Sequence, residues 1–357
     1  MRIKIGFVLG TNGIGGTETQ TFKLIKYLEK NKFDVYLFFL DRHRCNKEKI
    51  DFGKTKTKYL YNVGSGPLRS LSKLYFKFLL KYYSVNIIHI LSTKDIEYYS
   101  RMYQLNNITF FLSIRNMWML EDGSFREEIE TGLKNSHEVI CNSFSIQEKM
   151  KALGYDTKKV QVIYNNIDAQ NNSKIEERTK KRILYCGSLK PIKGSLDFVY
   201  MANIIAKKQK DIEFWVIGDG ILRKEMEKSV KVFGLEDTFT FFGHLPNNEI
   251  PYNDCNIFVS TSLSEGSSNS IIEACSNGLG VVATDIPASR EILEGKVFGA
   301  LVPVGNCESM AEKSIEFLNQ KPSEVIDRRE KGVEFVKDYF SKEQTLRKYL
   351  LIYQNIL

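Results

Sequence analysis

Residues 263–280, LSEGSSNSIIEACSNGLG, lie between two short runs of apolar and β-branched residues, NIFVST at 256–261 and GVVATD at 280–285. The flanking runs have the length and composition of buried strands, and the residues between them predict a short helix that ends at Gly278 and Gly280. A strand, a helix and a second strand in this order form a βαβ unit of a parallel sheet, whose loop opens at the carboxyl edge. Because ligands collect at that edge, this unit is the first candidate site.

The start of the predicted helix has the composition of an anion site. Glu265 lies in a Gly- and Ser-rich turn, Glu273 lies inside the helix, and residues 267–270 (SSNS) stand where the helix begins. Backbone N–H groups at a helix start, helped by hydroxyls and the positive end of the helix dipole, bind phosphate. Serine and asparagine are also ordinary N-cap residues, and Glu273 could be a solvated helix residue. Caps alone do not require the preceding Glu-Gly turn, which favours the phosphate site.

The pattern E-G-x-S-N-x-x-x-E at 265–273, continued by GLGVVATDIPASREI at 278–292, resembles the retaining glycosyltransferases of family 4, the glycosyl transferases of group 1. The resemblance implies an α/β chain with the GT-B fold, two Rossmann-like domains facing an interdomain cleft. It also implies that Glu273 holds the ribose of a nucleotide sugar and that Glu265 lies near the donor sugar. The donor diphosphate would lie on the turn between them, at Gly266, Ser268, Asn269 and Ser270.

A second glycine-rich loop, GTNGIGG at 10–16, follows an apolar run and precedes a predicted helix. Its glycines do not satisfy G-x-G-x-x-G, so they give little support to a dinucleotide fingerprint. The loop resembles instead the first loop of family 4, where Gly-Gly-x-Glu brings backbone N–H groups against the donor phosphates. Gly15, Gly16 and Glu18 carry that match. Paired glycines before a helix can also make a tight turn without a ligand, but the match at 265–273 favours donor binding.

A third loop, GSLKPIKG at 187–194, resembles the family loop whose Arg and Lys neutralise the donor diphosphate. Lys193 matches the Lys, so the resemblance implies that it acts in both catalysis and donor binding, the two roles also implied for Glu265. Ser188 stands in the Arg position, where it can donate a hydrogen bond but adds no charge. More of the stabilisation of the leaving group would therefore fall on Lys193. A lysine in a turn is otherwise usually just solvated.

The third candidate for catalysis is Arg115, which follows the apolar run ITFFLSI at 108–114. Many members of the resembled family carry a His near the reacting sugar here. Arg115 cannot act as a base because an arginine pKa is above roughly 12, but its guanidinium can bind a phosphate or a sugar hydroxyl. The alternative is an arginine that merely closes a strand at the surface. The four histidines form no metal set, and lone histidines are usually structural.

The 357 residues are too many for one ordinary core and fit two domains of Rossmann size. Strand-like and helix-like runs alternate in both halves. We expect an acceptor-side domain over 1–168, a polar linker over 169–182 and a nucleotide-sugar-binding domain over 183–340. The resemblance implies that an amphipathic helix over 341–357 crosses back to pack on the first domain.

Metal, redox and membrane-spanning signals are missing from the sequence. The chain has no D-x-D triplet, so it lacks the carboxylate ligands that usually bind the divalent metal in the other glycosyltransferase fold. We therefore expect no metal and no cofactor.

The six cysteines show no C-x-x-C pair, which predicts reduced thiols. No apolar run reaches spanning length and MRIKIGFVLG predicts a strand rather than a signal peptide, so we expect a cytoplasmic protein.

The excess of positive charge is confined to the first half of the chain. The formal net charge is +8, and residues 1–170 hold 26 Lys and Arg against 17 Asp and Glu, leaving 25 against 26 for the remainder. Such asymmetry predicts that the first half faces an anionic partner, either nucleic acid, a membrane or a phosphorylated acceptor. The chain carries no aromatic and basic recognition motif for nucleic acid, so we expect none to bind.

One predicted helix, 67–83, combines apolar and basic residues. Its apolar residues fall at helical spacing: Leu71, Leu74, Tyr75, Phe78, Leu79 and Tyr82. Its cations repeat every four residues on another face: Arg69, Lys73, Lys77 and Lys81. We expect the apolar face to cover the sheet. The basic face would be either solvated or attracted to an anionic membrane, which would make the protein peripheral on the inner face.

The resemblance implies transfer of a sugar, with retained anomeric configuration, from a nucleotide sugar. Among nucleotide sugars it favours a UDP-sugar. The implied acceptor is a glycan or a polyprenyl-diphosphate-linked glycan in bacterial-type envelope or exopolysaccharide synthesis. In this fold the departing diphosphate can take the acceptor's proton, so no protein nucleophile is needed. The alternatives are a nucleotide-sugar-binding protein without turnover and a transferase that acts on a soluble or protein acceptor. A glycosidase-like pair of Glu265 and Glu273 is disfavoured because the βαβ context is a phosphate site.

Overall fold

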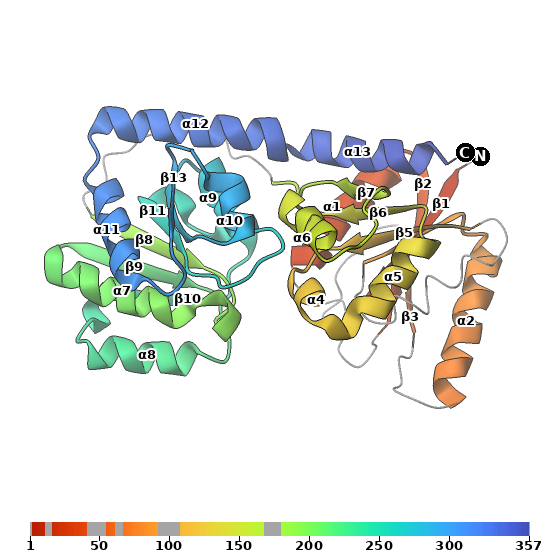
Figure 1. Cartoon of the computed structure of the whole chain (residues 1–357), viewed down its shortest axis with the longest axis horizontal. Coiled ribbons are helices and arrows are strands. Elements are labelled where there is room, and N and C mark those ends of the chain that lie inside the picture. The colour runs from red at the N-terminus through yellow and green to blue at the C-terminus, as the bar shows by residue number, and fades with distance from the viewer. Residues whose placement is uncertain are drawn as a thin grey trace. The chain divides into compact units, whose positions relative to one another are not determined.

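A computed structural model of the chain divides into two compact units, residues 1–166 together with 343–357, and residues 167–342. It describes residues 2–10, 16–40, 55–60, 67–91, 108–167 and 180–356, the side chains of 67–70 and 73 excepted. Each unit is a parallel sheet that is covered by helices on both faces (Figure 1).

Within the described residues, the first unit has a seven-stranded parallel sheet in the order β3-β2-β1-β4-β5-β6-β7. The order turns back at β1 and β4, as it does in doubly wound sheets. The strands are β1 (Ile3–Leu9), β2 (Phe33–Phe39), β3 (Lys56–Tyr59), β4 (Ile87–Ile90), β5 (Thr109–Ile114), β6 (Glu138–Cys141) and β7 (Val160–Val162). The helices are α1 (Gly16–Lys30), α2 (Pro67–Tyr83), α4 (Trp118–Glu121), η3 (Gly123–Phe125), α5 (Arg126–Asn135), α6 (Phe144–Ala152) and α13 (Lys342–Gln354).

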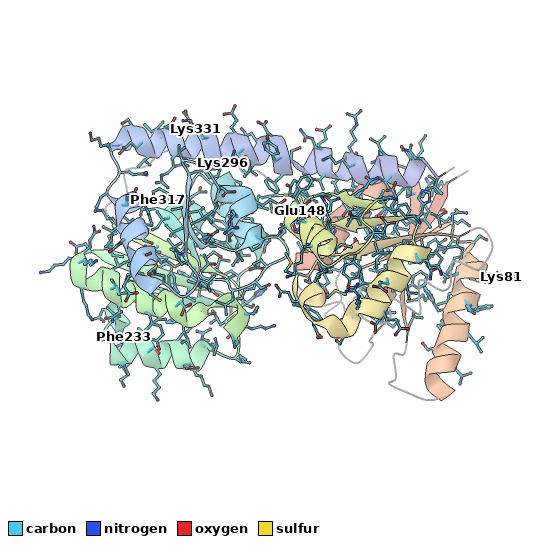
Figure 2. All side chains as sticks on the ribbon, viewed as in Figure 1. Lys81, Glu148, Phe233, Lys296, Phe317 and Lys331 are labelled. Atoms are coloured by element: carbon cyan, nitrogen blue, oxygen red, sulfur yellow. The ribbon has the colours of Figure 1, made fainter. Side chains whose placement is uncertain are left out.

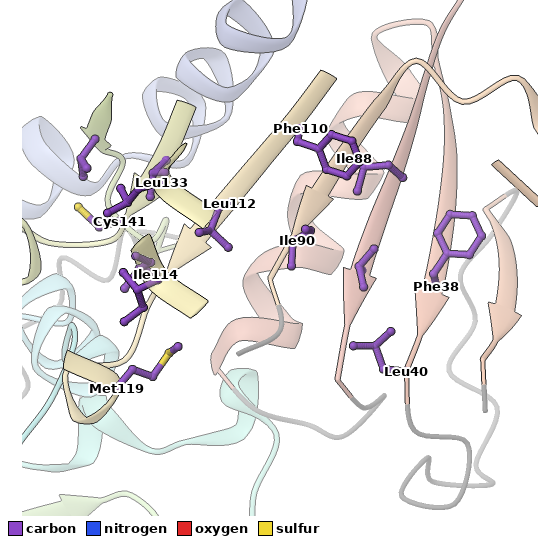
Figure 3. Close-up of a cluster of buried hydrophobic side chains, with 14 of the residues drawn as sticks. Phe38, Leu40, Ile88, Ile90, Phe110, Leu112, Ile114, Met119, Leu133 and Cys141 are labelled. Carbon is purple, nitrogen blue, oxygen red and sulfur yellow. The ribbon is translucent and has the colours of Figure 1, made fainter. Parts of the chain in front are cut away.

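Alternate side chains of these strands enter two separate cores. In β1, Phe7 packs toward α1 and α13, whereas Val8 packs toward α2, α4, α5 and α6. Figure 3 shows part of the second core, where side chains of β2, β4 and β5 meet Met119 of α4 and Leu133 of α5. On the opposite face, α13 contributes the fully buried ring of Tyr353. The C-terminal helix is therefore an integral layer of the first unit.

The second unit, as far as it is described, repeats the plan with a six-stranded parallel sheet in the order β10-β9-β8-β11-β12-β13. Its strands are β8 (Lys181–Cys186), β9 (Ile212–Ile217), β10 (Phe239–Gly243), β11 (Ile257–Ser260), β12 (Gly280–Thr284) and β13 (Gly299–Val302). Its helices are η4 (Pro191–Lys193), α7 (Ser195–Lys208), α8 (Arg223–Val232), η5 (Glu236–Thr238), η6 (Asn247–Glu249), η7 (Tyr252–Asp254), α9 (Asn269–Ser276), α10 (Pro287–Leu293), α11 (Cys307–Leu318) and α12 (Pro322–Phe340). In β11, Val259 packs toward α7, α8 and α11, while Phe258 is buried on the face covered by α9, α10 and α12.

Two parallel α/β sheets were predicted, and both are confirmed. The predicted C-terminal helix over 341–357 forms as α13 and packs in the first unit's core. Most of the predicted linker, residues 169–179, lies outside the described residues, and its last two residues, Lys181 and Arg182, already belong to β8. None of the described helices combines the length and the apolarity needed to cross a bilayer.

The helix predicted over 67–83 forms as α2, but the expectation that its apolar stripe covers the sheet is wrong. Of the described side chains of α2, Phe76, Leu79 and Leu80 are buried against the sheet, and Tyr83 packs there partly buried. Of the expected stripe only Leu79 is buried, and the other members are exposed: Leu71, Leu74, Tyr75, Phe78 and Tyr82. The helix has two apolar arcs with helical spacing. The sheet binds the arc of Phe76 because that ring packs edge-on against Phe38, with 5.0 Å between ring centroids.

Candidate functional site

The turn between β11 and α9 forms the predicted βαβ loop at the carboxyl edge of the second sheet. Ser268 occupies the N-cap position of α9, but its side chain makes no capping hydrogen bond. Ser268 is buried and its Oγ lies 3.4 Å from the Oγ of Ser270, while Gly266 and Asn269 are partly exposed. Since Ser268 does not cap the first turn with its own oxygen, the N–H groups and dipole of that turn suit an anion.

Lys193 and Glu265, predicted separately from two loops, contact each other. The Nζ of Lys193 donates to Oε1 of Glu265 in an ion pair, and Ser262 Oγ donates to the same carboxylate oxygen at 2.9 Å. The side chain of Lys193 is 27% exposed and that of Glu265 is 14% exposed, so the pair is only partly hydrated. An ammonium has three N–H donors, and Lys193 can therefore hold Glu265 and a ligand oxygen at the same time.

Backbone contacts between the two loops hold this pair together. Thr261 Oγ1 donates to the carbonyl oxygen of Lys193 at 2.8 Å, and the N–H of Leu263 donates to the carbonyl of Ile192 at 2.9 Å. The loops follow β8 and β11, which are neighbours in the sheet although β9 and β10 come between them in sequence. Gly194 makes the approach possible, because its φ is 58° and a Cβ on it would lie 2.1 Å from the Thr261 carbonyl oxygen.

Ser188 lies in the same loop after β8, where it is partly exposed. The Tyr185 hydroxyl donates to its backbone carbonyl at 3.4 Å. The loop is also tied to the end of β9, since the N–H of Gly187 donates to Ile217 O and the N–H of Leu189 donates to Asp219 O, both at 3.0 Å. These bonds position Ser188 at the same carboxyl edge as Lys193.

Glu273 is oriented by two side chains that local sequence patterns did not identify. Tyr252 donates its hydroxyl hydrogen to Oε2 of Glu273 at 2.9 Å, and Asn247 Nδ2 donates to Oε1 at 3.2 Å. Glu273 stays partly exposed, whereas Tyr252 is 4% exposed. Both partners come from 3-10 turns after β10, and isolated polar residues in a turn carry no periodicity that could have identified them.

Cys186 lies behind this cluster and is not a candidate nucleophile. Burial raises the pKa of its thiol to about 12, and the charge of Glu273 adds to the shift. Burial also raises the pKa of Tyr252 well above its usual value, with nearby Cys186 and Glu273 contributing. Both groups are therefore neutral, and Tyr252 remains a donor to Glu273 across the physiological pH range.

Arg115 lies in the first unit, directly after β5, and is 8% exposed. Its Nη2 donates to the Tyr349 hydroxyl of α13 at 2.9 Å and its Nη1 donates to Asn165 Oδ1 at 3.3 Å. Among the described residues its Nε has no hydrogen-bond partner. Arg115 is thus not a surface arginine, and it belongs to a different unit from Lys193 and Glu265. A buried cation whose described partners are neutral suits an anionic or hydroxyl-rich ligand.

His89 of β4 is a structural histidine, as the sequence predicted. It is fully buried, its Nδ1 hydrogen-bonds the Tyr353 hydroxyl of α13, and its Nε2 lies 2.8 Å from Ser113 Oγ. Burial lowers the pKa of His89 to about 3, and the positive charge of Arg115 contributes to the shift. His89 therefore stays neutral and helps to fix α13 on the first sheet.

Acid should weaken the first unit through His89. The unfolded chain protonates His89 near the ordinary histidine pKa of 6.5, whereas the folded chain does so only near 3, so stability is present above pH 6.5 and is lost as the pH falls toward 3. Between about pH 7.5 and about pH 5 this group should cost about 2 kcal/mol. Urea unfolding followed at Trp118 measures the loss, and His89→Gln should remove this part of the pH dependence. An equal loss in both proteins would assign the acid sensitivity to other groups.

The first glycine-rich loop is only partly described. Gly15 lies outside the described residues, Gly16 begins α1, and Glu18 stands in its first turn, partly exposed. Across the described ranges, no group of three or more His, Cys, Asp and Glu side chains is placed to hold a metal ion. Metal independence stays a prediction.

Sequence comparison matches two family models to the two halves of the chain. The model described as Glycosyltransferase Family 4 matches residues 14–171, and the model described as Glycosyl transferases group 1 matches residues 180–320. The chain is 27% identical over 169 residues to N-acetylgalactosamine-N,N'-diacetylbacillosaminyl-diphospho-undecaprenol 4-alpha-N-acetylgalactosaminyltransferase of Campylobacter jejuni, a match that covers 46% of each chain. It is 23% identical over 240 residues to poly(ribitol-phosphate) alpha-N-acetylglucosaminyltransferase of Staphylococcus aureus, covering 66% of this chain and 48% of the relative. The matches thus span about half the length of these curated relatives.

Structure comparison extends the similarity to the whole chain. The crystal structure of the Anabaena protein HepE in complex with UDP and glucose matches with a TM-score of 0.84 and 16% identity, covering 99% of this chain and 100% of HepE. At that identity the likeness shows the fold, which is GT-B. The two family models, the two doubly wound sheets and the E-G-x-S-N-x-x-x-E turn at the start of α9 agree. The chain belongs to the family 4 glycosyltransferases of the GT-B fold.

Proposed function

We propose that this protein transfers a sugar from a nucleotide-sugar donor, a UDP-sugar, to a glycan or lipid-linked glycan with retention of the anomeric configuration. The observation that carries the proposal is the contact between Lys193 and Glu265 beside the start of α9. It places a cation, a carboxylate and a helix N-terminus at one sheet edge. The UDP in the HepE crystal structure supports the choice of nucleotide.

In the proposed reaction the protein mainly positions charge. The donor diphosphate lies at the first turn of α9, where backbone N–H groups and the Lys193 ammonium stabilise the negative charge that develops on it. Glu265 holds Lys193 in place and faces the donor sugar. Glu273, fixed by Tyr252 and Asn247, accepts hydrogen bonds from the ribose hydroxyls.

The proposed step balances without a protein nucleophile. The bond between the anomeric carbon and the diphosphate oxygen breaks, and a bond from the acceptor oxygen forms on the same face of the sugar. The acceptor's proton passes to the departing diphosphate, which leaves as UDP. Arg115, a buried cation in the first unit, binds a phosphate or a sugar hydroxyl of the reactants.

The test is a panel of nucleotide sugars with the purified protein. A donor at 100 times its dissociation constant should stabilise the protein by about 2.7 kcal/mol, and that donor should release UDP. NMR of the transferred sugar then reads the anomeric configuration. Stabilisation without UDP release, even with acceptors present, would favour the rival function of a nucleotide-sugar-binding protein, which the uncharged Ser188 keeps open. An inverted product would overturn the retaining mechanism.

Removal of the Glu273 carboxylate should weaken donor binding. Glu273→Ala loses charge-assisted hydrogen bonds to the ribose and should raise the donor KM about 10- to 100-fold. Tyr252→Phe removes one of two donors that orient the carboxylate, so it should raise the donor KM about 5-fold with kcat nearly unchanged. Steady-state kinetics measure both, with Tyr200→Phe as an exposed control in the same unit. Unchanged donor KM in Glu273→Ala would remove Glu273 from the donor site.

Transfer should continue after chelation of divalent metals. Lys193 and the start of α9 supply positive charge where the diphosphate would bind, so a bridging cation is not required. Initial rates with and without an excess of EDTA should agree within about 2-fold. A rate that vanished with EDTA and returned with manganese or magnesium would contradict this arrangement.

We also propose that the acceptor or its surroundings are anionic and that the protein works at the inner face of a membrane. The excess of 26 cations over 17 acids in residues 1–170 supports this. The acceptors named for the two relatives, a diphospho-undecaprenol and a poly(ribitol-phosphate), both carry phosphate. A soluble or protein acceptor is the alternative, and transfer to a water-soluble glycan as fast as to a lipid-linked one would favour it.

A further inference from the structure

Helix α2 presents an apolar stripe to solvent. Five of its large side chains are exposed by 44% to 68%: Leu71, Leu74, Tyr75, Phe78 and Tyr82. They recur at three- and four-residue spacing, so they share one face along the helix. The rings of Phe78 and Tyr82 stack with 5.8 Å between centroids, which makes the end of the stripe continuous. The other arc, with Phe76 and Leu80, already anchors α2 to the sheet.

Two lysines line one border of this stripe. Lys77 and Lys81 are exposed, and each follows a stripe residue, Leu74 or Phe78, by three positions. Figure 2 labels Lys81 near the C-terminal end of α2. The sequence of α2, PLRSLSKLYFKFLLKYY, contains no acidic residue. An apolar face with a purely basic border is the pattern of a helix that lies in a membrane interface.

We propose that α2 docks the first unit on an anionic lipid bilayer, with the exposed apolar stripe in the headgroup and acyl boundary. Lys77 and Lys81 then contact lipid phosphates along the border. Tyr75 and Tyr82 suit this depth because each has an apolar ring and a polar hydroxyl. This deepens the anionic location proposed above, but it rests on the exposure and charge of α2 and not on sugar transfer.

Charge argues for a bilayer rather than a second copy of the chain. A twofold contact through the stripe would bring the basic borders of two α2 helices toward each other, and no acid of α2 could compensate. A bilayer with anionic headgroups offers apolar depth and negative charge together. It therefore complements the stripe and its border at once.

The test is sedimentation of the full chain with vesicles of phosphatidylcholine alone or with about 30% phosphatidylglycerol, in about 0.15 M and about 0.5 M NaCl. The wild type should bind the anionic vesicles at the lower salt and more weakly at the higher salt. Leu74→Ser, Phe78→Ser and Tyr82→Ser combined should lower binding at both salt concentrations, by at least about 10-fold at the lower one. Lys77→Gln with Lys81→Gln should lower it about 25-fold at the lower salt and remove most of the salt dependence.

Matched controls exist on α8 in the second unit. Lys224 and Lys228 are exposed at the same four-residue spacing, so Lys224→Gln with Lys228→Gln makes the same change of charge. Ile221, two residues before α8, and Val232, its last residue, are 79% and 72% exposed and provide the apolar control, Ile221→Ser with Val232→Ser. Both control variants should bind vesicles as the wild type does.

Three results would overturn the proposal. The first is vesicle binding by the stripe variant equal to that of the wild type, with circular dichroism confirming that both are folded. The second is no binding of the wild type to anionic vesicles. The third is a wild-type dimer in sedimentation equilibrium that the stripe variant converts to a monomer, which would assign the stripe to a second copy. Stabilisation by UDP should be unchanged in all α2 variants, so a failure of membrane docking is distinguishable from a failure of the proposed sugar transfer.

Discussion

Lys193→Met should lower kcat for sugar transfer by about 100- to 1,000-fold, because it removes a preorganised cation from the place where the leaving diphosphate gains charge. Methionine keeps most of the volume of the lysine stem and removes only the ammonium. Ser188 adds no charge at its position in the same loop, so Lys193 carries more of this stabilisation than it would with an arginine there. Donor KM should change less than kcat, since the charge is greatest in the transition state.

The same loop supplies the control for this prediction. Lys190 precedes η4 and is exposed, and Lys190→Met should leave kcat within about 2-fold of the wild type. Glu265→Gln separates the two halves of the ion pair, because it keeps Lys193 charged but releases it from its carboxylate. It should lower kcat more than it changes donor KM. Full activity of Lys193→Met would show that the pair is a structural contact between loops.

Local sequence patterns were sufficient to predict both sheets and the turn at 265–273. The strands around α9 are short runs of Ile, Val and Phe, and Gly278, with φ of 71°, ends the helix as predicted. The contact between Lys193 and Glu265 could not be obtained in this way. It depends on β8 and β11 being neighbours, and the order of strands in a sheet is set by tertiary packing that no local pattern contains.

The error at α2 has a related cause. Periodicity identifies an apolar face, but α2 has two such arcs. Which arc is buried depends on which one packs well against the side chains of the sheet. For Arg115 and Tyr252, too, local sequence patterns do not predict the contacts that single residues make.

The sequence predicts that Arg115 follows a strand, but its contact with Tyr349 of α13 joins positions 234 residues apart in sequence. Tyr252 meets Glu273 through a turn that no motif marks.

The close approach of the two loops makes Gly194 a sensitive position of the site. Gly194→Ala should destabilise the second unit by about 3 kcal/mol or more. Alanine at φ of 58° costs about 1–2 kcal/mol, and its Cβ would lie 2.1 Å from the Thr261 carbonyl oxygen, so the loops must separate. Separation breaks the hydrogen bonds from Thr261 to Lys193 and from Leu263 to Ile192, each worth about 1 kcal/mol.

Urea unfolding of the second unit can be followed alone, because the chain has two tryptophans and only Trp215 lies in that unit. In a Trp118→Phe background, Gly194→Ala should therefore shift the Trp215 transition. Gly234→Ala is the matched control: its φ is 67°, but a Cβ there would meet nothing within 4 Å, so it should cost only the about 1–2 kcal/mol of backbone strain. The difference between the two variants isolates the cost of separating the loops.

That separation also moves Lys193 away from Glu265. Gly194→Ala should therefore lose sugar transfer under conditions where it is still folded, whereas Gly234→Ala should keep it. Equal stability and equal activity of the two variants would mean that the loops can separate without cost, and the positioning assigned to Gly194 would be wrong.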